Sequence, residues 1–295
     1  MHRSYILVEG PHDVEFLARL LPKDVHRVRD FAALDPSWQP LVPRSYPHKG
    51  DLLARVPLPT FFAGPALSIA LHSAAGIDKL VKTLEESTAI FDTYKVALDS
   101  VAVVLDADDH VPPVQRHAAL RQRLRTLPRP ANWPVVGGEV APGPPRCGIF
   151  VLPDNEQPGS LEDLLLEASH QSYPGLHQRS EAFIATIDGD IGALGLIPRD
   201  LKDLRKPSGA RKATLACVAN VLRPGKAIQV AIQDGRWLDA AAIAALPRIQ
   251  SVQAFVQTLL GLGSTAAPGG LSPGSELAGL LADLAGGEQP GERGA

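Results

Sequence analysis

The strongest constraint on the fold is a continuous apolar run, Val-Ala-Val-Val-Leu, which covers residues 101–105 and ends directly on Asp106. Apolar side chains at every position, rather than at every second position, are typical of a strand covered on both faces, as in a parallel sheet. Runs at residues 4–9 and 148–155 are also apolar and end on acidic or amide side chains, and residues 67–76 form another candidate strand. The sequence therefore predicts buried parallel strands, several of which carry polar groups at their carboxyl ends.

Helical patterns lie between these predicted strands. Pro11 follows the first strand, and proline suits the first position of a helix because the amide that it lacks would have no partner there. The spacing of apolar residues predicts further helices over residues 77–91, 112–127, 160–170, 179–188, 210–222 and 250–262. Ser160 and Asp163 resemble a capping-box pair at the start of one of them. Strands that alternate with helices predict an α/β fold, with a mostly parallel sheet flanked by helices and a helical C-terminal part.

The predicted elements divide the chain into three parts. We expect an α/β domain over residues 1–170, with a further strand at residues 25–31 and an irregular, proline-rich insertion at about 32–66. A helical extension over residues 171–262 is expected to pack on this domain. The remaining stretch, residues 263–295, is rich in Gly, Pro, Ala and Ser, and we expect it to form a mostly disordered tail.

Composition limits the classes of function that the chain can have. The net charge is -3, so nucleic-acid binding would have to come from local basic patches or from bound metal ions. The two cysteines, Cys147 and Cys217, make neither a disulfide framework nor a cysteine-ligated zinc site. No window approaches the roughly 18 apolar residues of a membrane span, and the first apolar run is too short for a signal-peptide core. We therefore expect a cytoplasmic protein without membrane contacts.

Four carboxylates occupy positions from which they could converge. Glu9 and Asp13 are four residues apart across a strand-to-helix turn, and Asp106 and Asp108 are two apart at the end of the continuous apolar run 101–105. Ligands of parallel sheets gather at the carboxyl ends of the strands. Converging carboxylates repel one another unless a cation lies between them, and oxygen ligands without His or Cys favour Mg²⁺ or Mn²⁺. Each acid alone could be a solvated strand end or a first-turn helix acid, but the two stretches together favour a metal site.

The same stretches resemble a known domain. VEGPHD at residues 8–13 and VLDADD at residues 104–109 look like the Toprim domain, with the additional aspartate of the Toprim part of OLD-type nucleases. The stretch GIFVLPDNEQPGSLEDLLLEA at residues 148–168 is similar to a motif of the uncharacterised DUF3226 family. This resemblance covers roughly residues 4–260 and implies a Toprim-like, Rossmann-like sheet.

The resemblance also implies roles for individual residues. It implies that one or two Mg²⁺ or Mn²⁺ ions are held by Glu9, Asp13, Asp106 and Asp108, of which Glu9, Asp106 and Asp108 would be catalytic. Glu162 would be a further acid near a second ion, although a first-turn acid that stabilises its helix is an equally good interpretation. Lys212 begins a predicted helix in a context similar to that of a late lysine of the family, and would be a transition-state cation.

Two basic segments are candidates for contacts with phosphate groups. Residues 111–138 contain no acid and residues 202–212 only one; the candidates are Arg116, Arg121, Arg123, Arg125, Lys202, Arg205 and Lys206. Such clusters supply contacts with the nucleic-acid backbone that are independent of base sequence. For any single one of these residues, a solvated helix face is the simpler interpretation.

Two functions fit these patterns. The first is a metal-dependent nuclease that hydrolyses phosphodiester bonds, in genome defence or repair. The second is a non-catalytic Toprim module that binds nucleic acid, a nucleotide or a partner protein. The chain has no G-x-x-x-x-G-K-[ST] loop, so we do not expect it to hydrolyse ATP. The resemblance to OLD-type nucleases leaves room for a separate ATPase or a defence-system partner.

Overall fold

A computed structural model describes residues 1–43, 58–128 and 132–262. The tail expected at residues 263–295 and part of the proline-rich insertion lie outside these residues. Residues 1–262 belong to one compact unit, in which strands and helices alternate along the first part of the chain and helices dominate the second.

Seven strands form one sheet within the described residues. They are β1 (His2–Val8), β2 (His26–Arg27), β3 (Thr60–Ala63), β4 (Leu67–Ser73), β5 (Ser100–Asp106), β6 (Val140–Ala141) and β7 (Arg146–Leu152). Their order across the sheet is β2-β3-β4-β1-β5-β7-β6. The four central strands are parallel, whereas the strands at both edges pair in the antiparallel sense. The predicted α/β fold with a mostly parallel sheet is therefore confirmed.

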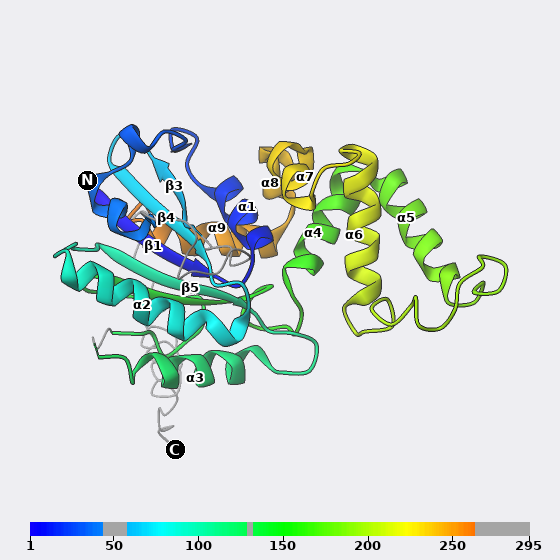
Figure 1. Cartoon of the computed structure of the whole chain (residues 1–295), viewed down its shortest axis with the longest axis horizontal. Helices are drawn as coiled ribbons and strands as arrows, with labels where there is room; N and C mark the ends of the chain where they lie inside the picture. The colour runs from blue at the N-terminus through cyan, green and yellow to red at the C-terminus, as the bar shows by residue number, and fades with distance from the viewer. Residues whose placement is uncertain (44–57, 129–131, 263–295) are drawn as a thin grey trace, which may run out of the picture. The chain divides into compact units, whose positions relative to one another are not determined.

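Helices cover both faces of this sheet (Figure 1). In chain order they are α1 (Pro11–Leu20), α2 (Leu80–Thr93), α3 (Pro113–Leu124), α4 (Leu161–Ser172), α5 (Pro174–Ile187), α6 (Gly209–Leu222), α7 (Ile228–Asp234), α8 (Ala240–Ala245) and α9 (Pro247–Leu259). Figure 1 shows α2 and α3 on one side of the sheet and α1 and α9 on the other. None of these described helices is long and apolar enough to cross a membrane.

The continuous apolar runs of the central strands are explained by this double cover. In β1, Ile6 and Val8 belong to a core that also contains residues of α1, α4 and α9, whereas Tyr5 and Leu7 belong to a second core with α2 and α3. All four side chains are fully buried. Each such aliphatic side chain contributes about 1.5–3 kcal/mol through burial, so every strand position stabilises one face or the other.

Several predicted boundaries were wrong. The strand expected at residues 25–31 is the two-residue β2. The insertion expected to be irregular contains a 3₁₀ helix at Pro36–Leu41 and the strand β3. The helix expected from residue 77 begins with a 3₁₀ turn, and α2 starts at Leu80. β3 was missed because an edge strand of four residues depends on its pairing with β4, which local sequence does not reveal.

Candidate functional site

Two strand ends meet at the carboxyl edge of the sheet. β1 and β5 are parallel neighbours in which Val8 is opposite Val104, so Glu9 follows β1 beside the end of β5. Oε1 of Glu9 accepts a hydrogen bond of 2.9 Å from the backbone amide of Asp106. The first acidic residue of each predicted stretch is therefore fixed to the other by sheet register and by this bond.

Asp13 comes from the first turn of α1 and lies at the same edge. The backbone amide of Gly10 donates a 2.7 Å hydrogen bond to Oδ2 of Asp13, as expected of an acid that closes the start of a helix. A Cβ atom at residue 10 would lie 3.2 Å from this oxygen, so glycine keeps the turn open. Asp13 is buried, and its carboxylate therefore depends on polar partners at this edge.

Burial and the charges of neighbouring acids disfavour the ionised forms of these carboxyl groups. Burial raises the pKa of Glu9 to about 7 and that of Asp13 to about 7, and the charge of Glu9 adds to the effect on Asp13. Burial also raises the pKa of Asp106 well above its usual range, followed by the charges of Asp13, Glu9 and Glu162. Within the described residues, no lysine or arginine forms an ion pair with Glu9, Asp13 or Asp106. These carboxyl groups therefore share one edge without a direct counter-charge, and their ionised forms are disfavoured.

Asp108 is paired with a cation, although its charge still raises the pKa of Glu9. Its backbone has a φ of 62° and forms an antiparallel bridge with Gly159, through a 2.8 Å bond from its amide and a 3.2 Å bond to its carbonyl. Gly159 itself has a φ of +142°, and an added Cβ would lie 2.7 Å from Oδ2 of Asp163. The bridge directs the Asp108 carboxylate toward Arg116, whose Nη2 lies 2.5 Å away and also donates to the Ala107 carbonyl.

The start of α4 supplies the remaining acids. The amide of Leu161 donates to Oδ1 of Asp106 at 2.8 Å, and that of Ser160 donates to Oδ2 of Asp163 at 2.8 Å, which confirms the predicted capping pair. Glu162 raises the pKa values of Glu9, Asp13 and Asp106, and its Oε1 is 3.7 Å from Nζ of Lys212. The Glu162 side chain is thus both part of the acidic group and paired with a cation.

The donor set fits a hard divalent cation in its chemistry and charge. All of the clustered donors are carboxylate oxygens, and within the described residues neither Oε2 of Glu9 nor Oδ2 of Asp106 has a hydrogen-bond partner. As the side chains lie, however, no group of three or more His, Cys, Asp or Glu residues in the described part of the chain is arranged to hold a metal ion. Glu9 and Asp106 could hold the ion with these oxygens, whereas one oxygen of Asp13 accepts from the Gly10 amide and one of Asp108 from Arg116.

A cleft of about 400 Å³ connects this edge with basic side chains. Arg116, Lys206 and Lys212 line it together with Asp106, Asp108 and Glu162. The other predicted basic residues lie elsewhere: Arg121 donates to the Trp133 carbonyl, Arg205 pairs with Asp188, and Arg123, Arg125 and Lys202 are exposed and line no part of this cleft. The structure therefore brings together only a subset of the two basic segments.

Two residues at the edge were missed as individual site residues. Arg211 makes a bidentate contact with Asp109, at 2.6 and 2.8 Å from Nη2, and its Nε is 3.4 Å from Asp163. His12 lies near Glu162 and Lys212, and burial lowers its pKa, so its imidazole is neutral at neutral pH. Arg211 belongs to the basic segment at residues 202–212 and His12 precedes Asp13, but neither pattern marked the residue itself as part of the site.

Comparison with known proteins finds a family that matches nearly the whole chain. The model of the family described as "Protein of unknown function (DUF3226)" matches residues 3–260. Among solved structures, a hypothetical protein from Pyrococcus horikoshii OT3 is similar at 17% sequence identity, over 87% of this chain and 100% of that one, with a TM-score of 0.43. No curated protein matches the sequence.

Proposed function

This chain belongs to the DUF3226 family, and we propose that it is a Mg²⁺- or Mn²⁺-dependent, Toprim-type nuclease that hydrolyses phosphodiester bonds of nucleic acid. The observation that carries the proposal is the cluster of Glu9, Asp13 and Asp106 at the carboxyl edge of parallel strands. Glu9 raises the pKa of Asp13, Asp13 and Glu9 raise that of Asp106, and none of the three has an ion-pair partner among the described residues. A divalent cation is the simplest group that would satisfy this cluster.

The neighbouring side chains suit a phosphate-containing substrate. A bound Mg²⁺ or Mn²⁺ would polarise a phosphoryl oxygen and activate a water molecule. Lys212 and Arg116 extend from α6 and α3 into the same cleft, where each can contact a phosphate oxygen. His12 is neutral because burial lowers its pKa, so it can accept a proton near Glu162.

The Toprim assignment and the biological setting are part of the proposal. VEGPHD at residues 8–13 and VLDADD at residues 104–109 support a Toprim-type site, and their resemblance to OLD-type nucleases favours a role in genome defence or repair. Such a role would involve a separate ATPase or another defence-system partner, because this chain lacks a phosphate-binding G-x-x-x-x-G-K-[ST] loop.

One observation favours a second candidate function, a non-catalytic module that binds nucleic acid, a nucleotide or a partner protein. Two of the predicted metal ligands are already paired, Asp108 with Arg116 and Glu162 with Lys212. If these ion pairs persist in the presence of divalent cations, the edge would hold a ligand without activating water.

A cleavage assay with a binding control distinguishes the two. The full chain is incubated with single- and double-stranded DNA and with RNA, with Mg²⁺, with Mn²⁺ or with a chelator. We expect metal-dependent cleavage that Asp106→Ala abolishes and that Asp154→Asn retains, because Asp154 pairs with Arg248 rather than with the acidic cluster. Equal cleavage by wild type and Asp106→Ala would exclude this site, and tight binding without turnover under either metal would favour the non-catalytic function.

A further inference from the structure

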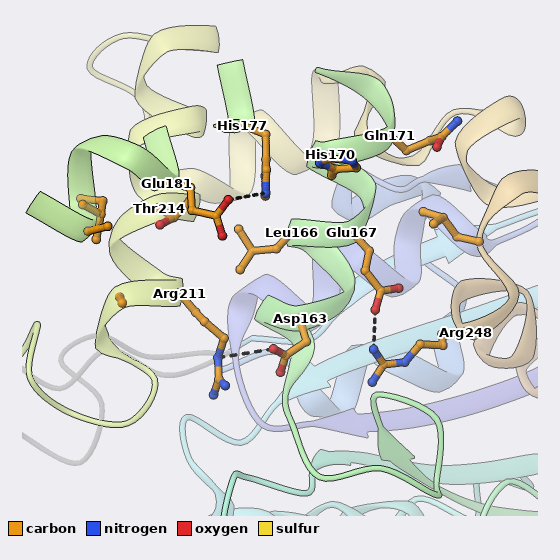
Figure 2. A pocket seen from close by; sticks show the side chains of 14 residues that line it. Asp163, Leu166, Glu167, His170, Gln171, His177, Glu181, Arg211, Thr214 and Arg248 are labelled. Atoms are coloured by element: carbon orange, nitrogen blue, oxygen red, sulfur yellow. Dashed lines mark hydrogen bonds and ion pairs between the residues drawn. The ribbon is translucent and has the colours of Figure 1, made fainter. Parts of the chain in front are cut away.

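A second, larger cavity lies beside the acidic cleft. Its volume is about 690 Å³, within the range of sites for small molecules, and residues of α4, α5 and α6 line it (Figure 2). Arg211 borders both this cavity and the acidic cleft. A ligand whose phosphate group lies in the cleft could therefore extend past Arg211 into the cavity.

The charges of the cavity do not suit a second phosphate group. Its two arginines are already neutralised: Arg211 contacts Asp109 and Asp163, and Arg248 contacts Asp154 and Glu167. Glu181 adds a carboxylate that is 70% exposed. Three of the lining residues are acidic and two are arginines, so the cavity favours a neutral group with hydrogen-bond donors.

The remaining lining supplies apolar contact area and polar groups beside it. Leu166, Ile184 and Leu246 line the cavity, and Figure 2 shows Leu166 between the polar groups at its two ends. His177 is buried, and its Nδ1 lies 3.2 Å from Oγ of Ser169, which fixes the orientation of the ring. Its Nε2 lies 4.0 Å from Oε2 of Glu181, so a carboxylate acceptor lies next to the apolar surface.

We propose that this cavity binds a nucleobase with an exocyclic amino group, while the phosphate of the same nucleotide lies in the acidic cleft on the other side of Arg211. A flat ring would pack against the aliphatic side chains, and its amino group would donate to Glu181. This inference rests on the proposed function, because it takes the phosphate group to bind at the acidic edge.

Three ligands separate the contributions of base, amino group and phosphate. Isothermal titration calorimetry of the full chain with Mg²⁺ would measure the affinities for adenosine monophosphate, inosine monophosphate and ribose 5-phosphate. We expect adenosine monophosphate to bind about tenfold more tightly than ribose 5-phosphate, because burial of one ring face adds about that factor. Inosine monophosphate, which has no amino group, should bind more weakly than adenosine monophosphate.

Two substitutions on α5 provide a matched pair. Ala185 is exposed and lines the cavity, whereas Ala182 is exposed on the same helix and does not. Ala185→Trp should fill the cavity and abolish the preference for adenosine monophosphate over ribose 5-phosphate, and Ala182→Trp should retain it. Glu181→Gln should reduce the preference for adenosine over inosine monophosphate.

The outcomes distinguish this inference from the proposed function. Equal affinities for adenosine monophosphate and ribose 5-phosphate would overturn the nucleobase site and leave the acidic edge as a phosphate site. An unchanged preference in Ala185→Trp would also overturn it, because the base would then bind elsewhere. If neither ligand binds in the presence of Mg²⁺, the acidic edge is not a phosphate site and both proposals are wrong.

Discussion

Oδ1 of Asp106 accepts a 2.8 Å hydrogen bond from the amide of Leu161, so the end of the central strand β5 is fixed to the N-terminus of α4. A helix N-terminus favours an ionised carboxylate. Burial, followed by the charges of Asp13, Glu9 and Glu162, opposes ionisation and raises the pKa of Asp106. The helix thus positions a carboxylate that its other neighbours destabilise, and a bound cation would reverse that balance.

Asp106→Asn tests this balance. An asparagine oxygen can still accept from the Leu161 amide, while the repulsion with Asp13 and Glu9 is removed. We expect the metal-free variant to unfold at a higher temperature than wild type at pH 8, by about 2–4 °C for each kcal/mol of relieved repulsion. The rise in Tm that Mg²⁺ or Mn²⁺ causes in wild type should be lost. Thermal unfolding followed by circular dichroism, with and without chelator, measures both effects.

The control for this experiment is Asp154→Asn. Asp154 follows β7 but pairs with Arg248 at 2.9 Å, so its substitution should leave the metal-dependent rise in Tm unchanged. A metal-dependent rise that survives in Asp106→Asn would show that the ion binds elsewhere.

The pKa of Glu9 predicts how stability depends on pH in the metal-free protein. This pKa is raised from 4.5 to about 7, chiefly by burial. The folded protein binds this proton more tightly than the unfolded chain does. The protonated side chain therefore contributes stability that is fully present below about pH 4.5 and is lost as the pH rises through about 7. The loss amounts to at most about 3 kcal/mol, reduced by solvent screening at this half-buried side chain.

Glu9→Gln is the variant that isolates this effect. A glutamine oxygen can still accept from the Asp106 amide, and the side chain no longer titrates. From pH 5 to pH 8 in chelator, the free energy of unfolding of wild type should therefore fall relative to that of Glu9→Gln, as measured by urea denaturation. Parallel pH profiles of the two proteins would contradict the raised pKa.

The interior of the sheet was predictable from sequence, whereas its edges were not. The run at residues 101–105 needs an apolar side chain at every position because Ala102 and Val104 face one core while Val101 and Val103 face the other. β3 (Thr60–Ala63) and β6 (Val140–Ala141) are too short to leave such a pattern. Both are held by antiparallel pairing with longer strands, which is a tertiary effect.

The candidate site, too, could be predicted only in part from the sequence. Residues at the ends of neighbouring parallel strands must share an edge, so the proximity of Glu9 and Asp106 followed from the apolar runs. The direction of the Asp108 side chain could not be predicted in this way, because its positive φ results from the bridge with Gly159. Arg211 could not be placed either, since it reaches Asp109 only through the packing of α6, about a hundred residues further along the chain.

Arg211 should stabilise the edge more than an exposed ion pair does. Its guanidinium makes two hydrogen bonds with Asp109 and lies close to Asp163, and its side chain is only 27% exposed. Arg211→Gln leaves Asp109 without this partner, and we expect it to lower the free energy of unfolding by about 1–3 kcal/mol. Arg211→Lys should not restore the loss, because the single ammonium of lysine cannot replace the separate Nη2 and Nε groups that reach Asp109 and Asp163. Chemical denaturation measures both variants.

The comparison is Lys206→Met, which removes the exposed ion pair with Asp203. Exposed pairs contribute less than about 1 kcal/mol, so this variant should be close to wild type in stability. Equal losses for Arg211→Gln and Lys206→Met would show that the Arg211 contacts are no stronger than a surface pair.

Lys95→Gly should stabilise the protein by relieving strain at the end of α2. Lys95 has a φ of 54°, and its amide bonds to the Asp92 carbonyl while that of Val96 bonds to the Phe91 carbonyl. These two bonds form a Schellman motif, in which glycine is the preferred residue at the left-handed position. We expect Lys95→Gly to raise the free energy of unfolding by about 0.5–1 kcal/mol, measured by urea denaturation. Ala89→Gly, at an exposed position in the interior of α2, should lower it by about 1 kcal/mol, because glycine weakens a helix interior. A loss of stability in both variants would contradict the left-handed conformation of Lys95.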